Sequence, residues 1–180
     1  MTTKDTVYIA LFAAIYAVLG ALPMIVLPFN PVPITAQSLG PMLAGSILGA
    51  KRAAFASLLF IAIALTGFPI MSGGRGGIGL ILGPTGGFIL GFPISAYSIG
   101  FLFEKNWHRL NTTWAFIYIL LGGVVILYVI GLLWTSLLFD IPLNKAFLGA
   151  IIFIPGDIIK AAIAATTAMV IKRAYPLIKE

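Results

Sequence analysis

Long apolar stretches without charge are the main pattern of this chain, separated by short segments that hold prolines, glycines or basic residues. Residues 6–50 carry no charge, but three prolines within 28–33 cannot continue a helix and divide this stretch in two. The pattern predicts six transmembrane helices, at residues 6–27, 35–50, 53–67, 84–103, 113–139 and 145–172. Most of them approach the roughly 20 residues that a helix needs to cross a bilayer core.

The composition agrees with a membrane protein, since 61% of the residues are hydrophobic and 9% are charged. A soluble domain carries about 25% charged residues. We therefore expect an all-α integral membrane protein, a six-transmembrane-helix bundle in which residues 1–180 form a single membrane domain. The absence of cysteine excludes disulfides, iron–sulfur clusters and thiol chemistry. The net charge of +6 does not indicate nucleic-acid binding, because the basic residues lie singly or in pairs between apolar stretches.

Lysine and arginine predict the orientation, because cytoplasmic loops of membrane proteins carry an excess of both. Arg75 and Lys145 fall on one side of the predicted membrane, and eight basic residues fall on the side of the termini. These eight are Lys4, Lys51, Arg52, Lys105, Arg109, Lys172, Arg173 and Lys179. Both termini are therefore expected in the cytoplasm, and segments 28–34, 68–83 and 140–144 outside. This arrangement predicts a substrate pocket open to the outside.

Two charged residues, Asp157 and Lys160, interrupt the last predicted helix. Three positions apart, they share one helix face and can neutralise each other. An ionisable group at the bilayer centre costs roughly 2.5 to 3.5 kcal/mol on insertion scales, so such residues usually have a function. Pro155 just before them removes a backbone donor and favours a break in the helix. The combination predicts a polar substrate site near the midplane, and a structural ion pair that fixes the helix in the bundle is the alternative.

The glycine-rich segment 73–79 carries a single arginine, Arg75. Its glycines match the pattern G-x-G-x-x-G, but the strand, soluble helix and downstream acid that a dinucleotide site requires are missing. Glycines on both sides of an arginine suit a lid that closes over an anion, and a guanidinium can bind a carboxylate through two hydrogen bonds. An arginine that only reaches lipid headgroups is the alternative.

Four uncharged residues are further candidates for the pocket. Gln37 follows the proline-rich outer segment, where its amide can also bond across helices. Tyr97 lies in the middle of the fourth predicted helix, away from the membrane interface that tyrosines usually mark. Gly86 and Gly87 belong to a series of small residues typical of close helix packing, and their backbone can also approach a ligand.

Alanines four residues apart follow the first predicted helix, with Ala10 and Ala14 in one row and Ala13 and Ala17 in another. Small residues at this spacing allow two helices to approach closely. The pattern predicts either packing inside the bundle or a docking surface for another membrane subunit, and the sequence leaves both open.

The chain contains no GxxxxGK[ST] motif and no arrangement of residues typical of catalysis. We therefore expect neither an enzyme nor a protein that hydrolyses ATP by itself. Two kinds of transport remain open: a substrate-binding subunit energised by other proteins, and an ion-coupled secondary transporter of a small carboxylate-bearing solute. Many secondary transporters are built from inverted repeats, which are not evident in this sequence.

Three motifs resemble signatures of the BioY family, whose members are the biotin-binding S components of energy-coupling factor (ECF) transporters. They are Asn-Pro-Val-Pro-Ile-Thr-Ala-Gln at 30–37, Gly-Pro-Thr-Gly-Gly at 83–87 leading into Gly91-Phe92, and Pro-Gly-Asp-Ile-Ile-Lys at 155–160. The resemblance covers essentially the whole chain and implies capture of biotin at the plasma membrane of a prokaryote, with no cofactor or metal. It also implies two ATP-binding cassette ATPases and a transmembrane coupling subunit as partners, the latter contacting the alanines of the first helix.

Biotin matches the candidate residues chemically. Its ureido group offers two N–H donors and one carbonyl, so Asp157 can accept from the N–H groups and Lys160 can donate to the carbonyl. Arg75 can hold the valerate carboxylate. Apolar walls can surround the fused rings, as in most small-molecule pockets.

Overall fold

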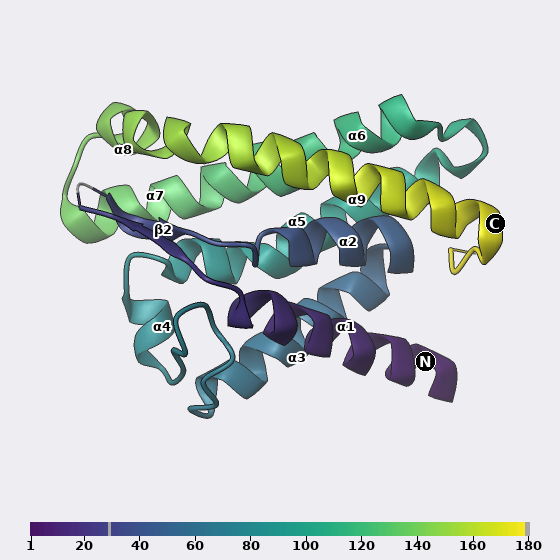
Figure 1. Ribbon diagram of the computed structural model, residues 1–180, viewed down its shortest axis with the longest axis horizontal. Helices are drawn as coiled ribbons and strands as arrows, with labels where there is room; N and C mark the ends of the chain where they lie inside the picture. The colour runs from purple at the N-terminus through teal and green to yellow at the C-terminus, as the bar shows by residue number, and fades with distance from the viewer. Residues whose placement is uncertain (29, 179–180) are drawn as a thin grey trace.

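The computed structural model describes residues 1–28 and 30–178, and almost all of its regular structure is helical (Figure 1). Four helical stretches are long and apolar enough to cross a membrane, at Thr3–Ala21, Gly86–Lys105, Thr112–Phe139 and Leu143–Ala174. Two further predicted helices are shorter, at 10 and 16 residues. The expectation of a helical membrane protein is confirmed, whereas the six membrane crossings stay a prediction.

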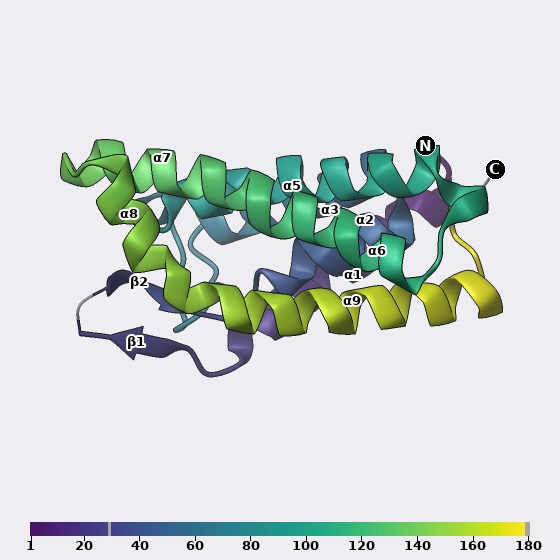
Figure 2. The same cartoon turned by 90° about the horizontal axis from the view of Figure 1, so that it is seen from above.

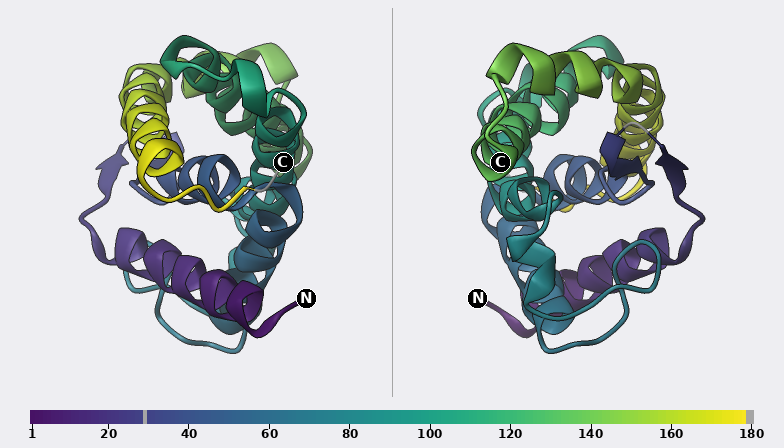
Figure 3. Two further views of the ribbon diagram at one scale, coloured as in Figure 1. Left: turned by 90° about the vertical axis from the view of Figure 1, so that its right-hand side faces the viewer. Right: turned by 90° about the vertical axis from the view of Figure 1, so that its left-hand side faces the viewer.

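The elements follow one another as α1 (Thr3–Ala21), β1 (Ile25–Leu27), β2 (Asn30–Ile34), α2 (Leu39–Leu48), α3 (Ala50–Leu65), α4 (Gly79–Leu82), α5 (Gly86–Lys105), η1 (Trp107–Arg109), α6 (Thr112–Leu120), η2 (Leu121–Ile126), α7 (Leu127–Phe139), α8 (Leu143–Ala150), η3 (Ile151–Phe153) and α9 (Ile154–Ala174). The long helices run side by side along the longest dimension of the molecule, and the views of Figure 3 look along them. Both termini lie at one end, called here the terminal end, and β1, β2, α4 and α8 lie at the opposite loop end (Figures 1 and 2).

The first predicted helix is too long by six residues, because α1 ends at Ala21. Pro23 disfavours a helical conformation of the residue before it, and Leu22 is extended. Ile25 and the residues after it form β1, which pairs with β2 in an antiparallel hairpin. The predicted helix is therefore wrong at Ile25–Leu27, where β-branched residues favour extended backbone.

The core of the bundle forms where α5 packs against α2, α3 and α7. Tyr16 and Phe60 stack in it with 5.2 Å between their ring centroids, and the Tyr16 hydroxyl lies 2.6 Å from Ser57 Oγ. Helices α2 and α3 are separated by Gly49 alone, whose φ of 82° suits glycine. The tight connection brings two short helices into the centre of the fold.

The last predicted helix is divided by the 3₁₀ turn η3, so that α8 and α9 follow different directions (Figure 2). The break precedes Pro155, which lies in the first turn of α9, where its missing N–H costs no helical hydrogen bond. Asp157 lies in the same first turn. A carboxylate is stabilised there, because the helix dipole is positive at its N-terminus.

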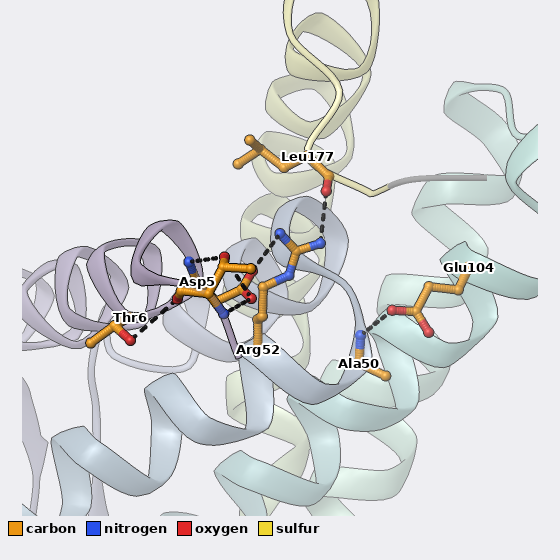
Figure 4. Close-up of polar contacts among 7 residues, drawn as sticks. Asp5, Thr6, Ala50, Arg52, Glu104 and Leu177 are labelled. Carbon is orange, nitrogen blue, oxygen red and sulfur yellow. Dashed lines mark hydrogen bonds and ion pairs between the residues drawn. The ribbon is translucent and has the colours of Figure 1, made fainter.

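Polar contacts join separate segments at the terminal end (Figure 4). Arg52 of α3 lies 3.6 Å from Asp5 of α1 and donates to the Leu177 carbonyl at 2.7 Å. Glu104 of α5 accepts from the Ala50 N–H at 2.8 Å. Several of the basic residues counted as orientation signals gather at this end, whereas Lys179 lies outside the described residues.

Candidate functional site

A cavity lies among β2, α2, the glycine-rich segment, α5, α7 and α9. Its lining is mostly apolar, with a few polar and charged groups, as is common in small-molecule sites. The lining residues are Val32, Pro33, Ile34, Thr35, Gln37, Ser38, Met71, Arg75, Thr85, Phe88, Ile89, Phe92, Leu127, Tyr128, Phe153, Asp157 and Lys160.

Asp157 and Lys160 form the charged centre of this cavity. The Lys160 Nζ atom lies 2.7 Å from Asp157 Oδ1, and only 4% of Asp157 is exposed. Ser38, at the start of α2, donates to the same oxygen at 3.1 Å and accepts from Lys160 Nζ at 2.9 Å. Tyr128 of α7 donates to Asp157 Oδ2 at 2.5 Å. Three elements thus hold one buried carboxylate.

The remaining hydrogen-bonding capacity of Asp157 is small. A carboxylate offers about four lone-pair sites. Ser38 and Lys160 occupy both sites of Oδ1, and Tyr128 occupies one of Oδ2. One site on Oδ2 remains for a ligand donor, so a second ligand N–H needs one of the present donors to move.

Gln37 is buried and holds the glycine-rich segment in place. Its Oε1 atom accepts from the Ser72 N–H at 3.1 Å and from the Ser72 hydroxyl at 2.9 Å, and its Nε2 atom donates to the Ile70 carbonyl at 3.3 Å. The amide therefore combines a place in the cavity wall with a structural role for the residues that precede Arg75.

Arg75 also lines the cavity, at the turn formed by the pairing of Met71 with Arg75. Its Nε–H donates to the Ser72 carbonyl at 3.0 Å. A guanidinium has five N–H donors, and this bond uses one of them. The side chain is therefore oriented by its own turn while its terminal nitrogens remain suited to an anion.

Three of the predicted pocket residues lie elsewhere. Tyr97 is 45% exposed and stacks against Phe101, because its side chain points from a face of α5 that does not contact the cavity. A Cβ atom at Gly86 would collide with the Ile81 carbonyl oxygen, and one at Gly87 would collide with the Trp134 side chain. The two glycines therefore serve close packing, and Tyr97 is not among the residues that line the cavity.

Ser38 and Tyr128 are the residues of the charged centre that the sequence analysis missed. Neither stands out in the sequence, since serine and tyrosine recur throughout the apolar helices. For Ser38, the one feature that could have identified it is its position directly after Gln37, at the start of a predicted helix. For Tyr128 there was no local signal, because its contact with Asp157 depends on how α7 packs beside α9.

The alanines of α1 divide between two faces. Ala10 and Ala14 are exposed, whereas Ala13 is buried in the core and Ala17 is partly buried against it. The row with Ala13 therefore serves internal packing. The row with Ala10 and Ala14 is exposed, so it is available for contact with a partner subunit.

In the described part of the chain, no three His, Cys, Asp or Glu residues are grouped as candidate metal ligands. The charged centre instead resembles a site for an organic molecule with both donors and acceptors.

Comparison with known proteins identifies the family. The model of the BioY family matches residues 1–177. The chain is 43% identical to the biotin transporter BioY of Rhizobium etli, over 99% of this chain and 98% of that protein. It is 38% identical to the probable biotin transporter BioY of Bacillus subtilis, over 96% and 92% of the two chains.

A solved structure is similar over nearly the whole fold. The crystal structure of the S-component for biotin from an ECF-type ABC transporter aligns with a TM-score of 0.92 at 34% identity, over 98% of this chain and 97% of that one. Together with the family match, this similarity establishes that the chain belongs to the BioY family.

Proposed function

We propose that this protein is the biotin-binding S component of an ECF-type vitamin transporter. The relatives are named as biotin transporters, and the similar structure is described as the S-component for biotin. The observation that carries the proposal is the pair of the buried Asp157 with the partly buried Lys160, which faces an otherwise mostly apolar cavity together with Ser38 and Tyr128. Such a centre offers both donors and an acceptor to a neutral ureido group.

The ureido ring binds at the charged centre in this proposal. Lys160 Nζ donates to the ureido carbonyl, and Asp157 Oδ2 accepts one ureido N–H at its remaining lone pair. The second N–H reaches Asp157 Oδ1 when the Ser38 hydroxyl rotates away from it. Phe88, Phe92 and Phe153 supply apolar surface for the fused rings.

Arg75 binds the valerate carboxylate in this proposal. It lines the same cavity as the charged centre and lies on the glycine-rich segment. Gln37 positions that segment through Ser72. Biotin thereby closes its own site, because the carboxylate fixes a segment whose glycines otherwise allow several conformations.

The membrane topology is also a proposal. Helices α2 and α3 complete six membrane crossings with the four long helical stretches, both termini face the cytoplasm of a prokaryotic cell, and the cavity opens outward. The basic residues at the terminal end support this orientation. A cysteine at Arg75 should react with an impermeant thiol reagent from outside, and a cysteine at Lys105 only from inside. The opposite labelling would reverse the orientation.

Other subunits energise transport in this proposal. The chain carries no ATPase motif, so a transmembrane coupling subunit and two ATP-binding cassette ATPases supply the energy, and the exposed row with Ala10 and Ala14 is the candidate contact. No cofactor takes part, and biotin and membrane lipid are the small-molecule partners.

Titration calorimetry of the purified protein with biotin tests the central claim. We expect tight binding of one biotin per chain, no ATP hydrolysis, and efficient uptake into liposomes only with the partner subunits. Concentrative uptake by this chain alone, abolished by collapse of an ion gradient, would instead identify an ion-coupled secondary transporter.

A further inference from the structure

A lateral groove lies between α7 and α8, outside the proposed biotin cavity. It encloses about 730 Å³. We call it the α7–α8 groove, and its lining residues are Val124, Val125, Tyr128, Val129, Leu132, Leu133, Leu143, Asn144, Phe147, Leu148 and Ile154. Among these residues, the Asn144 amide and the Tyr128 hydroxyl are the polar groups. The groove is therefore an apolar channel with a polar group near its outer end.

The break between α8 and α9 explains why the groove exists. Helix α8 has eight residues and changes direction at η3 (Figure 2). Its small residues Ala146 and Ala150 pack against Tyr128 and Leu132 in a cluster separate from the main core. The bulky Phe147 and Leu148 are exposed and line the groove instead. Large apolar side chains are thus placed around an open space rather than in a packed interior.

The size of the groove fits one hydrocarbon chain of a lipid. Along η2 and α7 it extends from Val124 to Leu133, which corresponds to about 14 Å of helix. This is close to half of the roughly 30 Å bilayer core, the depth of one leaflet. A cavity of about 150 Å³ already holds benzene, so the groove has room for many methylene groups.

The chemistry at the outer end fits a phospholipid headgroup. Asn144 lines the groove there, and the exposed Lys145 follows it in the first turn of α8. An ammonium group and an amide suit a phosphate. We propose that the α7–α8 groove binds one acyl chain of a phospholipid whose phosphate lies beside Asn144 and Lys145.

The bound chain also supports the biotin site, a consequence that rests on the proposed function. Tyr128 lines both the groove and the cavity, and its hydroxyl donates to Asp157 Oδ2. An acyl chain packed against the ring fixes the position of this hydroxyl. When the groove is empty, the Tyr128 ring lacks packing contacts on that side. The position of the hydroxyl that donates to Asp157 is then less well defined. Lipid and biotin binding are therefore coupled.

The test compares wild type with Val129→Trp, which fills the groove, and with Val170→Trp, a matched control on α9. Val129 and Val170 are 55% and 65% exposed, and Val170 does not line the groove. Native mass spectrometry from the same detergent counts the bound phospholipids. We expect wild type and Val170→Trp to retain one phospholipid that Val129→Trp lacks. Equal retention by all three proteins would overturn the groove as a lipid site.

A photoreactive residue identifies the occupant directly. Phe147→p-benzoylphenylalanine, illuminated in membranes, should cross-link to a phospholipid. A cross-link to a second copy of this chain would overturn the lipid proposal in favour of a dimer interface, and a cross-link to another protein would overturn it in favour of a subunit contact.

The coupling is tested with delipidated protein in detergent. Added dioleoyl phosphatidylglycerol should tighten biotin binding of wild type and Val170→Trp by about fivefold, the lower range of couplings between two sites. It should leave Val129→Trp unchanged. An equal response of Val129→Trp and wild type, or no response of wild type, would overturn the coupling. Lipid retention is counted without biotin, so the groove can be judged even if the proposed function fails.

Discussion

Charged side chains are used differently at the two ends of this molecule. At the loop end, Asp157 and Lys160 contact each other and face a cavity. At the terminal end, Arg52 donates to the Leu177 carbonyl, and Lys172 donates to the Trp107 carbonyl at 2.6 Å. The first pair can exchange partners with a ligand, whereas Arg52 and Lys172 bind the backbone of neighbouring segments, and Arg52 also lies 3.6 Å from Asp5.

The role of a charged residue in an apolar chain, structural or ligand-binding, therefore depends on the group that it contacts. Backbone carbonyls at helix ends need donors, and the basic residues at the terminal end supply them. The Asp157–Lys160 pair also joins α2, α7 and α9, but it does so beside a cavity. We therefore propose the loop end as the binding end, whereas the contacts at the terminal end join the helices.

Asp157→Asn should have the largest effect on biotin binding, and it tests the role given to the loop end. The change removes the charge that Lys160, Ser38 and Tyr128 all contact, and it turns one acceptor into a donor. Loss of a hydrogen bond to a charged group costs roughly 1.5 to 3 kcal/mol, so biotin affinity should fall about ten- to a hundredfold in calorimetry.

The matched control is Asp140→Asn, at an exposed residue in the left-handed conformation that asparagine tolerates. Its affinity should equal that of wild type. Lys160→Met should resemble Asp157→Asn, and the double variant should be less than additive because both residues belong to one network. Parental affinity of a well-folded Asp157→Asn protein would make the pair a structural one.

The sequence predicted this pair because two charges in an apolar helix are expensive and therefore conspicuous. It did not predict Tyr128, because that contact depends on the packing of α7 against α9. It also placed Tyr97 in the cavity, since the position along a helix is easier to infer than the face that a side chain occupies. The hydrophobicity of residues 22–27 suits a strand and a helix equally, so the hairpin was missed although Pro23 marked the end of α1.

Arg75→Ala should have a smaller and more selective effect. If the guanidinium holds the valerate carboxylate, its removal should weaken biotin binding by about tenfold, because the side chain is only partly buried and a solvated ion pair contributes less than a buried one. An uncharged biotin amide should bind wild type and Arg75→Ala almost equally. The comparison of the two ligands by calorimetry isolates the charge, and an equal loss for both would assign Arg75 a role in the shape of the segment instead.

Glu104→Ala should have the smallest effect on function: it should lower the stability of the protein and leave biotin affinity almost unchanged. Helix α3 follows Gly49, which has no side chain to cap the helix, and Glu104 of α5 accepts from the buried Ala50 N–H in its place (Figure 4). A buried donor without a partner costs about 1 to 3 kcal/mol, and the lower end applies because Glu104 is itself exposed. The midpoint of thermal unfolding in detergent should therefore fall for Glu104→Ala but largely recover for Glu104→Gln, whose amide oxygen still accepts.

Biotin affinity should stay within about twofold of wild type in both, since couplings of fivefold or more need two linked sites. A tenfold loss of affinity in Glu104→Ala would show that the two ends act together rather than separately.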